Sequence, residues 1–307
     1  IVISNSNDKN TQLIVNAINH QLSNYGNTIS ITNPSKLKQG NTNKIDALIS
    51  DMQNGNVDAL ITYNVNPSYS LANSKEFNDA LKNVSLKIST SQHHDETAHL
   101  MDYVCPDSHN LESWGDANPK HGVFSLMQPT ITPLFNTRQF QESLLSWMNK
   151  SDYQAFQKNY WISKGVDWNK SLHDGYFNIN EPAIKVKRFT DNSTSVAKKN
   201  NESIELEIYE TVALGDGRQA NNPWLQELPD PITRACWDNY LTISASTADK
   251  LGLSNWNVAN GAMNGSVVNI TDGENILENV PVMKHFPIYS HRLLYFCLLY
   301  TSPSPRD

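Results

Sequence analysis

Strand-like and helix-like segments alternate along the first 150 residues, and this alternation constrains the fold more than any other feature. Short apolar or β-branched runs, typical of buried strands, occur at 1–4, 28–32, 59–63 and 86–90. Apolar residues recur at helical spacing in 11–22, in 45–52 and after Ser74. Strands separated by helices indicate βαβ units. We therefore expect an α/β domain over residues 1–150, with a doubly wound, mostly parallel sheet of Rossmann-like type.

The sequence from Ser203 onwards has the texture of a β protein. Residues 204–209 alternate strictly between apolar and polar, as a half-buried strand does. A short helix is predicted over 244–251, and Gly252 stops it. Strands over 266–271 and 280–283 flank Asp272-Gly273, which is a hairpin signal. We predict a small β-barrel domain over residues 203–286.

Two further segments complete the predicted organisation. Residues 151–202 form a helical and loop connector, in which aromatic residues from Tyr153 to Trp168 predict one amphipathic helix. Residues 287–307 contain a dense apolar run followed by Ser-Pro-Ser-Pro-Arg-Asp. We interpret them as a foreign tail and exclude them from the fold. Because the chain opens on Ile1, we interpret it as an internal piece of a longer protein.

Composition excludes several classes of function. The net charge of -7 argues against a nucleic-acid partner, because binding phosphates requires a basic face. No apolar run approaches the roughly 20 residues of a membrane helix. The three cysteines, Cys105, Cys236 and Cys297, form no C-x-x-C pair. We therefore expect no iron–sulfur cluster and no cysteine-based zinc site within this chain.

Histidines and acids cluster at 93–109, and this stretch has two interpretations. One is a metal site, which would make the chain a metal hydrolase using His94, His99 and Cys105. However, no H-E-x-x-H arrangement is present, and no spacing matches a known zinc pattern. The other is a helix N-terminus, at which Asp95 and Glu96 stabilise the positive end of the helix dipole. We favour the helix N-terminus and assign no metal ligand.

Two short stretches are candidates for ligand contact. The turn Asn64-Val65-Asn66-Pro67 follows a predicted strand, at the sheet edge where ligands usually bind. The alternative is an ordinary turn, because Asn and Pro are common turn formers. In the second stretch, Glu112 could grip a polar ligand or cap a helix, and we expect Trp114 to fill a domain interface.

A loop rich in Pro and Trp follows residue 214. Its Gly-Asp-Gly-Arg segment could hold an anion with Arg218, but it lacks the length and the Lys of a P-loop. Trp224 and Trp237 lie in a stretch without a nucleophile or base. We therefore interpret this loop as a surface that docks against another domain or subunit, through Trp224, Trp237 and Arg218. No nucleophile–base–orienter set can be assembled anywhere, so we assign no catalytic residue.

These stretches together resemble the molybdopterin oxidoreductase superfamily. The motifs that carry the resemblance are Asn66-Pro67, Asp95-Glu96-Thr97-Ala98, Asp102-Tyr103-Val104-Cys105-Pro106 and Leu111-Glu112-Ser113-Trp114-Gly115-Asp116. The family often has Gly where this chain has Asn64, and Asn can also adopt a left-handed backbone. The resemblance implies that any bound pterin would contact Asn66, Thr97, Asp102 and Glu112. It also implies that Ser244–Leu253 is the helix of a double-psi, molybdopterin-dinucleotide-binding barrel.

A closer likeness is to the large iron–sulfur, molybdopterin-like subunit of alternative complex III, a quinol-oxidising membrane complex. Trp114-Gly115-Asp116, residues 222–231 and Trp237-Asp238-Asn239-Tyr240 carry this likeness, over residues 1–285. It implies a periplasmic subunit, attached to the membrane through partner subunits, whose pterin-type domains have lost the molybdopterin.

In that family the metal ligand of working molybdoenzymes lies upstream of this region, and the iron–sulfur cysteines lie downstream. The resemblance therefore implies a scaffold without a cofactor in this chain. The alternative is a fragment of an active molybdopterin enzyme of the polysulfide or thiosulfate reductase type, binding the pterin guanosine dinucleotide.

Overall fold

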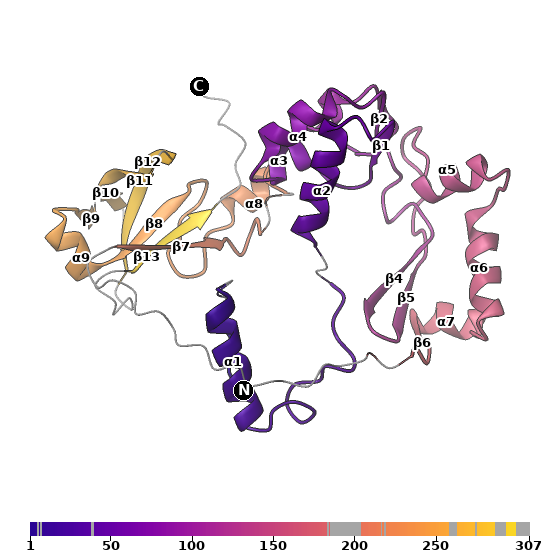
Figure 1. The fold of residues 1–307 in the computed structure, drawn as a ribbon, viewed down its shortest axis with the longest axis horizontal. Helices are drawn as coiled ribbons and strands as arrows, with labels where there is room; N and C mark the ends of the chain where they lie inside the picture. Colours follow the sequence, from indigo (N-terminus) through magenta and orange to yellow (C-terminus); the bar gives the residue numbers. More distant parts are fainter. Residues whose placement is uncertain are drawn as a thin grey trace. The chain divides into compact units, whose positions relative to one another are not determined.

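The computed structural model describes residues 1–4, 6, 8–37, 40–182, 184, 204–215, 217, 219–257, 263–273, 275–285 and 293–298 (Figure 1). The chain divides into two compact units, Ile1–Ala197 and Lys198–Asp307. The division expected from the sequence, with boundaries at 150, 202 and 286, stays a prediction.

The first unit contains two small sheets and their helices. Its described helices are α1 (Lys9–Gln21), α2 (Thr42–Gln53), α3 (Pro67–Ser70), α4 (Ser74–Leu81), α5 (Phe140–Trp147), α6 (Tyr153–Ser163) and α7 (Trp168–Asp174). Its described strands are β1 (Ala59–Thr62), β2 (Leu86–Ser89), β3 (Tyr103–Val104), β4 (Gly115–Lys120), β5 (Val123–Met127) and β6 (Tyr176–Asn178).

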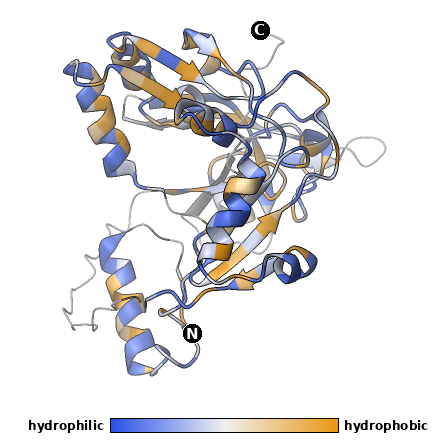
Figure 2. Cartoon of the chain, turned by 90° about the vertical axis from the view of Figure 1, so that its right-hand side faces the viewer, coloured by the Kyte–Doolittle hydropathy of each residue, from blue (hydrophilic) through white to orange (hydrophobic). Residues whose placement is uncertain are grey.

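The strands β1, β2 and β3 form a three-stranded parallel sheet, with Ala59 paired to Leu86 and Ile88 to Tyr103. The predicted α/β character with a parallel sheet is thereby confirmed. The apolar faces of α2 and α4 meet in a core that includes Met52, Phe77 and Leu81. Figure 2 shows hydrophobic and hydrophilic residues on different sides of the helices, as expected for helices packed on one side only.

Two predicted strands are absent from the described residues. Residues 1–4 pair with no strand, because the Asn19 side chain takes both backbone groups of Val2: Asn19 Oδ1 accepts its amide at 2.9 Å and Asn19 Nδ2 donates to its carbonyl at 2.7 Å. Within 28–32, Thr28 and Ile29 donate their amides to the Asn24 carbonyl in a turn. Hydrogen bonds to the Asn19 side chain and to the Asn24 carbonyl therefore replaced the ladder that the β-branched pattern predicted.

The second sheet of this unit was not predicted. It is antiparallel in the order β4-β5-β6, and α6 and α7 pack on it through Leu126, Trp161, Trp168 and Phe177. The single helix expected over 153–168 is wrong, because α6 ends at Ser163 and α7 begins at Trp168. Gly165 has a left-handed φ of 82°, which terminates α6.

The second unit is mainly β-structure. Its described elements are β7 (Glu205–Glu210), α8 (Pro223–Glu227), β8 (Tyr240–Ser244), α9 (Ala245–Lys250), β9 (Asn255–Asn257), β10 (Met263–Gly265), β11 (Val267–Asp272), β12 (Asn275–His285) and β13 (Leu293–Leu298). The alternating strand at 204–209, the helix after Ser244 and the hairpin at Asp272-Gly273 are confirmed.

Five strands of this unit form a mixed sheet in the order β11-β12-β8-β13-β7. Its core contains Leu241, Ile243, Ala248, Val280 and Val282. The described residues form no closed barrel, so the double-psi barrel expected from the resemblance is not seen in them.

Part of the segment that we excluded from the fold lies in this sheet. Strand β13 pairs in parallel with β7 and antiparallel with β8. Its exclusion from the fold was therefore wrong for residues 293–298; the apolar run has a composition typical of strands. The foreign origin of residues 287–307 stays a prediction.

In the part of the chain that the structure describes, no helix has the length and apolar character needed to span a bilayer.

Candidate functional site

The candidate site is the edge at which the parallel strands β1, β2 and β3 end. Carboxyl ends of parallel strands meet at one edge, so the loops that follow them are brought together. After β1, the chain turns at Asn64, whose φ is 52°. This is the left-handed backbone that we expected Asn to tolerate there, and it directs the chain into α3, which begins at Pro67.

Asn66 and Thr97, predicted as ligand contacts, bind each other across this edge. Asn66 Oδ1 accepts the Thr97 hydroxyl at 2.6 Å and the Thr97 amide at 3.2 Å. Asn66 Nδ2 donates to Glu96 at 2.7 Å, and the Ser68 amide donates to Thr97 Oγ1 at 3.0 Å. Thr97 is 0 % exposed. The network therefore fixes the β1 loop to the β2 loop, and it uses the groups that a ligand would need.

Glu96 and Ser68 complete this network, and we had not assigned either as a site residue. Glu96 neighbours the Thr-Ala pair of the family motif, and Ser68 lies two residues after Asn66. The motif spacing was a usable signal for Glu96. The role of Ser68 depends on its backbone amide, which the sequence does not reveal.

The acids and histidines at 93–99 form a turn. Asp95 Oδ1 accepts the Ala98 amide at 2.7 Å, and Asp95 Oδ2 accepts the Ser91 hydroxyl at 2.7 Å. The rings of His94 and His99 lie 5.6 Å apart. Among the described residues, no three His, Cys, Asp or Glu side chains gather as metal ligands would. Asp95 therefore holds the start of the short 3-10 helix Ala98–Leu100, whose N-cap position is Thr97. The longer helix that the helix N-terminus interpretation expected is not formed at this position.

Asp102, predicted beside the first two residues, lies elsewhere. Its carboxylate accepts the Lys87 amide at 2.9 Å and pairs with the Lys87 ammonium at 3.1 Å. These hydrogen bonds, amide first, hold the pKa of Asp102 below its ordinary value. Lys87 is near the start of β2, so Asp102 lies at the amino end of the strands, opposite the candidate edge.

Glu112 joins two loops. Its carboxylate accepts the His109 amide at 3.1 Å and the Leu134 amide at 3.1 Å. The amides of Thr130 and Ile131 add two bonds to the Leu111 carbonyl. Glu112 therefore caps a turn rather than a helix. Both of its carboxylate oxygens accept hydrogen bonds from backbone amides.

Trp114 packs inside the first unit. Its ring lies 6.2 Å from that of Trp168 on α7, and its carbonyl accepts the Gln139 amide group at 2.5 Å. Trp114 thus joins β4 to the helices that follow.

In contrast to Trp114, the tryptophans in the Trp-rich loop of the second unit are exposed to solvent. Trp224 is 82 % exposed and Trp237 is 51 % exposed. Arg218, the third predicted docking residue in this loop, lies outside the described residues. Leu228 and Ile232 add further exposed apolar area.

The backbone of this loop is nevertheless firmly bonded. Asn222 Oδ1 caps α8 through the Trp224 and Leu225 amides at 3.1 and 3.3 Å. Asp230 accepts the amides of Ile232 and Thr233 at 2.9 and 2.7 Å. Burial raises the pKa of Asp230, but hydrogen bonds from these amides and from the Thr233 and Tyr240 hydroxyls together lower the net pKa. The loop is therefore a rigid frame that presents aromatic side chains.

A groove of about 480 Å³ lies in the first unit between the turn joining α6 to α7 and strand β6. Lys164, Lys170 and Asp174 are among its lining residues, and none of the residues that we predicted for the site lines it.

Comparison with known proteins finds relatives of the segment that contains the parallel sheet. Residues 2–140 match the family Molybdopterin oxidoreductase, so this segment is similar to a domain of that family. A stretch of 92 residues is 35% identical to the menaquinone reductase, molybdopterin-binding-like subunit of Nitratidesulfovibrio vulgaris. That match covers 29% of this chain and 13% of the relative.

Among solved structures, the fold is similar to acetylene hydratase from Pelobacter acetylenicus, with a TM-score of 0.52 and 16% identity. The similarity covers 85% of this chain and 40% of that structure. At this identity it establishes a shared fold. The chain spans less than half of each of these two proteins.

Molybdopterin is the cofactor that this family suggests, and the hydrogen bonds test whether the chain fits it. Asn66 and Thr97 bind each other, Glu112 binds two backbone amides, and Asp102 faces Lys87. In this arrangement the four residues do not form an open set of donors and acceptors at one edge. They do not fit a pterin without breaking bonds that the chain makes with itself.

Proposed function

We propose that this chain is a fragment of a large, molybdopterin-like subunit of a quinol-oxidising respiratory complex, of the alternative complex III type. Its two units serve as scaffold domains without a bound pterin. The second unit corresponds to a β-barrel domain of the molybdopterin-dinucleotide-binding type. Iron–sulfur clusters belong to a downstream part of the same subunit. The subunit lies on the periplasmic side and is attached to the membrane through its partners.

The observation that carries the proposal is the closed network of Asn66, Thr97 and Glu96. A polar site kept for a ligand leaves donors or acceptors facing outward, whereas these groups are paired with each other around a buried Thr97. The similarity to a subunit of a menaquinone reductase supports a respiratory setting.

The exposed tryptophans support an assembly role. Large aromatic side chains on a rigid loop are the usual anchors of protein interfaces. Trp224 and Trp237 meet that description, and electron transfer requires neighbouring subunits to be held at fixed distances.

The second candidate is a fragment of an active molybdopterin enzyme of the polysulfide or thiosulfate reductase type. The family match over residues 2–140 favours it. In that case the loops at Asn66, Thr97 and Glu112 would open to hold the pterin guanosine.

Elemental analysis of the purified full-length parent separates the two candidates. Iron without molybdenum is expected for a scaffold subunit, and stoichiometric molybdenum would overturn our proposal.

The docking role is tested separately with Trp224→Ala in the parent complex. We expect partner subunits to be lost on purification, because truncating an interface anchor costs at least about 2 kcal/mol. Lys250→Ala, on helix α9 of the same unit, is the control. Complete assembly of the Trp224 variant would show that this loop is not an anchor.

A further inference from the structure

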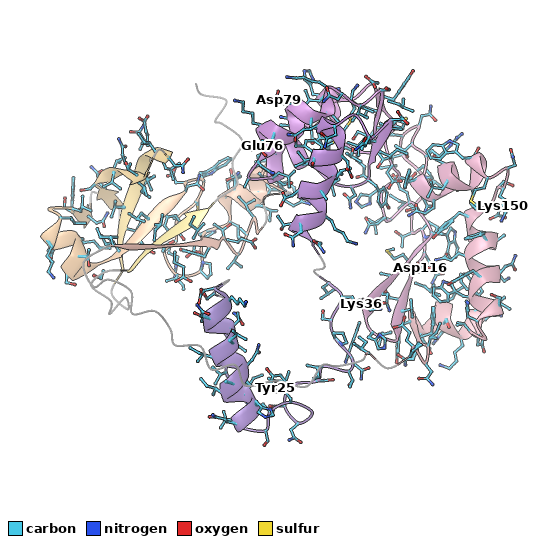
Figure 3. All side chains as sticks on the ribbon, viewed as in Figure 1. Tyr25, Lys36, Glu76, Asp79, Asp116 and Lys150 are labelled. Atoms are coloured by element: carbon cyan, nitrogen blue, oxygen red, sulfur yellow. The ribbon has the colours of Figure 1, made fainter. Side chains whose placement is uncertain are left out.

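The antiparallel sheet of the first unit has two outer strands, β4 and β6, and the chain itself covers the edge of β4. Lys36 donates its amide to the Pro119 carbonyl at 2.8 Å. His121 donates its amide to the Pro34 carbonyl at 3.1 Å. The Lys36 ammonium, labelled in Figure 3, pairs with Glu181 at 3.4 Å. An extended segment therefore closes this edge through backbone bonds and one ion pair.

The opposite edge of the sheet, along β6, is open. Ile179 donates its amide to the Gly122 carbonyl, and Phe177 is paired with Phe124, so residues 177 and 179 bond to β5. Backbone groups alternate in direction along a strand, so those of residues 176 and 178 point away from β5. No group in the described part of the chain bonds to them. Such a row of free donors and acceptors is a template for another strand.

This open edge forms one side of the groove of about 480 Å³. Tyr176 and Asn178 line the groove, and other lining residues come from α7 and from the turn before it. The volume lies in the range of about 300–1,000 Å³ that is usual for ligand sites. The free backbone groups of β6 therefore face a space that is bounded by protein and large enough for a short extended segment.

The charges that line the groove favour an acidic occupant. Lys170 pairs with Asp174 on α7, and Asp167 accepts the Lys170 amide at 3.1 Å as the N-cap of that helix. The Lys164 ammonium lies 5.5 Å from the centre of the Tyr160 ring, and no described carboxylate pairs with it. Both acids of the groove thus have partners within the chain, whereas Lys164 has room for a carboxylate.

We propose that the groove binds an extended acidic segment of another polypeptide, which adds to the β6 edge as a further strand. Backbone bonds to Tyr176 and Asn178 hold the segment, and a Glu or Asp side chain on it pairs with Lys164. In strand addition, main-chain hydrogen bonds give affinity and the side chains give specificity. The segment that closes β4 within this chain combines the same two kinds of contact, with the charges reversed. The proposed function does not use this site, and the site does not depend on it.

Amide hydrogen exchange of the 307-residue chain, read by NMR at Tyr176 and Asn178, tests the proposal. The probe is the peptide acetyl-Thr-Val-Thr-Glu-Thr-Val-Thr-amide, whose β-branched residues favour an extended backbone. At about 1 mM peptide we expect exchange at both amides to slow about ten-fold, because protection grows as 1 + [L]/Kd. The same peptide with an N-methyl group on every residue cannot pair as a strand and should have no effect. Unchanged exchange with the first peptide would overturn the proposal, and so would equal protection by both.

The role of Lys164 is tested with a second peptide, in which lysine replaces the glutamate. We expect it to bind wild type at least about three-fold more weakly, as one exposed ion pair predicts. Lys164→Gln should remove this preference. Lys158→Gln, on α6 and outside the groove lining, is the matched control and should keep it. Equal binding of the two peptides to wild type would overturn the acidic assignment.

The edge itself is tested with Asn178→Pro. Proline removes the outward amide and places its ring on the open edge, while the bonds of Phe177 and Ile179 to β5 remain. We expect this variant to lose peptide protection at Tyr176, and the matched control Asn178→Ala to keep it. Equal Tm values for the two variants show that the loss is not unfolding; if the proline variant melts lower, Lys164→Gln takes its place. Protection of Tyr176 in a folded Asn178→Pro variant would overturn the proposal.

Discussion

Two loop regions of this chain use hydrogen bonds in opposite ways. At the edge of the parallel sheet, the side chains of Asn66 and Thr97 turn inward and bind each other. In the loop of the second unit, side chains such as Asn222 and Asp230 hold the backbone, and Trp224 and Trp237 face outward. The comparison teaches that polar side chains at a strand edge can be used up within the fold, whereas polar side chains that hold a loop can leave large aromatic side chains exposed.

The largest expected effect contrasts a buried with an exposed tryptophan. Trp161 is buried against Phe124 and Phe177, so Trp161→Ala should destabilise the first unit by about 3–5 kcal/mol. Trp224→Ala should change stability by no more than about 0.5 kcal/mol. Hydrogen exchange, followed by mass spectrometry on peptides from both units, measures the two effects. Equal destabilisation by both variants would break the contrast.

The next prediction concerns the closed network. Thr97→Val preserves shape and removes the hydroxyl that donates to Asn66 and accepts from Ser68. We expect a loss of about 1–3 kcal/mol in the first unit, because buried groups lose their partners. Thr130→Val is the control, since its hydroxyl binds the Leu111 carbonyl from an exposed position. Chemical denaturation compares them, and an unchanged Thr97→Val would mean that the network does not hold the edge.

A smaller effect is expected in the loop of the second unit. Asp230→Ala removes the acceptor of two backbone amides and of the Thr233 hydroxyl, and should cost about 0.5–2 kcal/mol. It should also speed hydrogen exchange in residues 228–237. Asp238→Ala, a matched change at a side chain that caps no amide among the described residues, should leave exchange unchanged. If Asp230→Ala exchanges like wild type, the Asp230 carboxylate is not what makes the loop rigid.

The smallest effect is a dependence on pH. Glu181 accepts the Gly122 amide at 2.7 Å, Lys36 Nζ at 3.4 Å and His121 Nδ1 at 2.8 Å. These contacts, the amide first, lower its pKa below the ordinary value of 4.5. A lowered folded-state pKa stabilises the fold above pH 4.5, and this stability is lost as pH falls through the lower folded value.

We therefore expect Glu181→Gln to lower the stability of the first unit at neutral pH and to flatten its acid dependence below pH 4.5. Urea unfolding from about pH 3 to 7 measures the difference between the variant and wild type. A difference that is constant over this range would show that Glu181 does not titrate with folding.

Much of the fold was predictable from local patterns. The apolar repeats of α2 and α4, the parallel pair β1 and β2, and the hairpin at Asp272-Gly273 all follow from periodicity and turn chemistry. The failures have identifiable causes. Val2 and Ile29 looked like strand residues, but the Asn19 side chain binds both backbone groups of Val2, and the Asn24 carbonyl accepts the amide of Ile29. The helix expected to continue to Trp168 ended because Gly165 adopts a left-handed backbone.

The candidate site was predictable only in part. The motif spacing identified Asn66 and Thr97, and the structure does bring them together. The same motif included Asp102, which lies at the opposite end of the strands because β3 starts one residue later and pairs with β2 in parallel. Closeness in sequence therefore did not imply a shared edge.

The sequence by itself determined the alternation of strands and helices, the polar character of the strand-end loops and the aromatic character of the loop at 222–240. Those properties depend on local periodicity and on residue type. Only the tertiary structure decided that Asn66 binds Thr97, that Trp114 is used within its own unit, and that Gln157 keeps a buried oxygen without a partner. Each of these depends on distances between residues far apart in the chain, which hydrophobic pattern and turn chemistry do not encode.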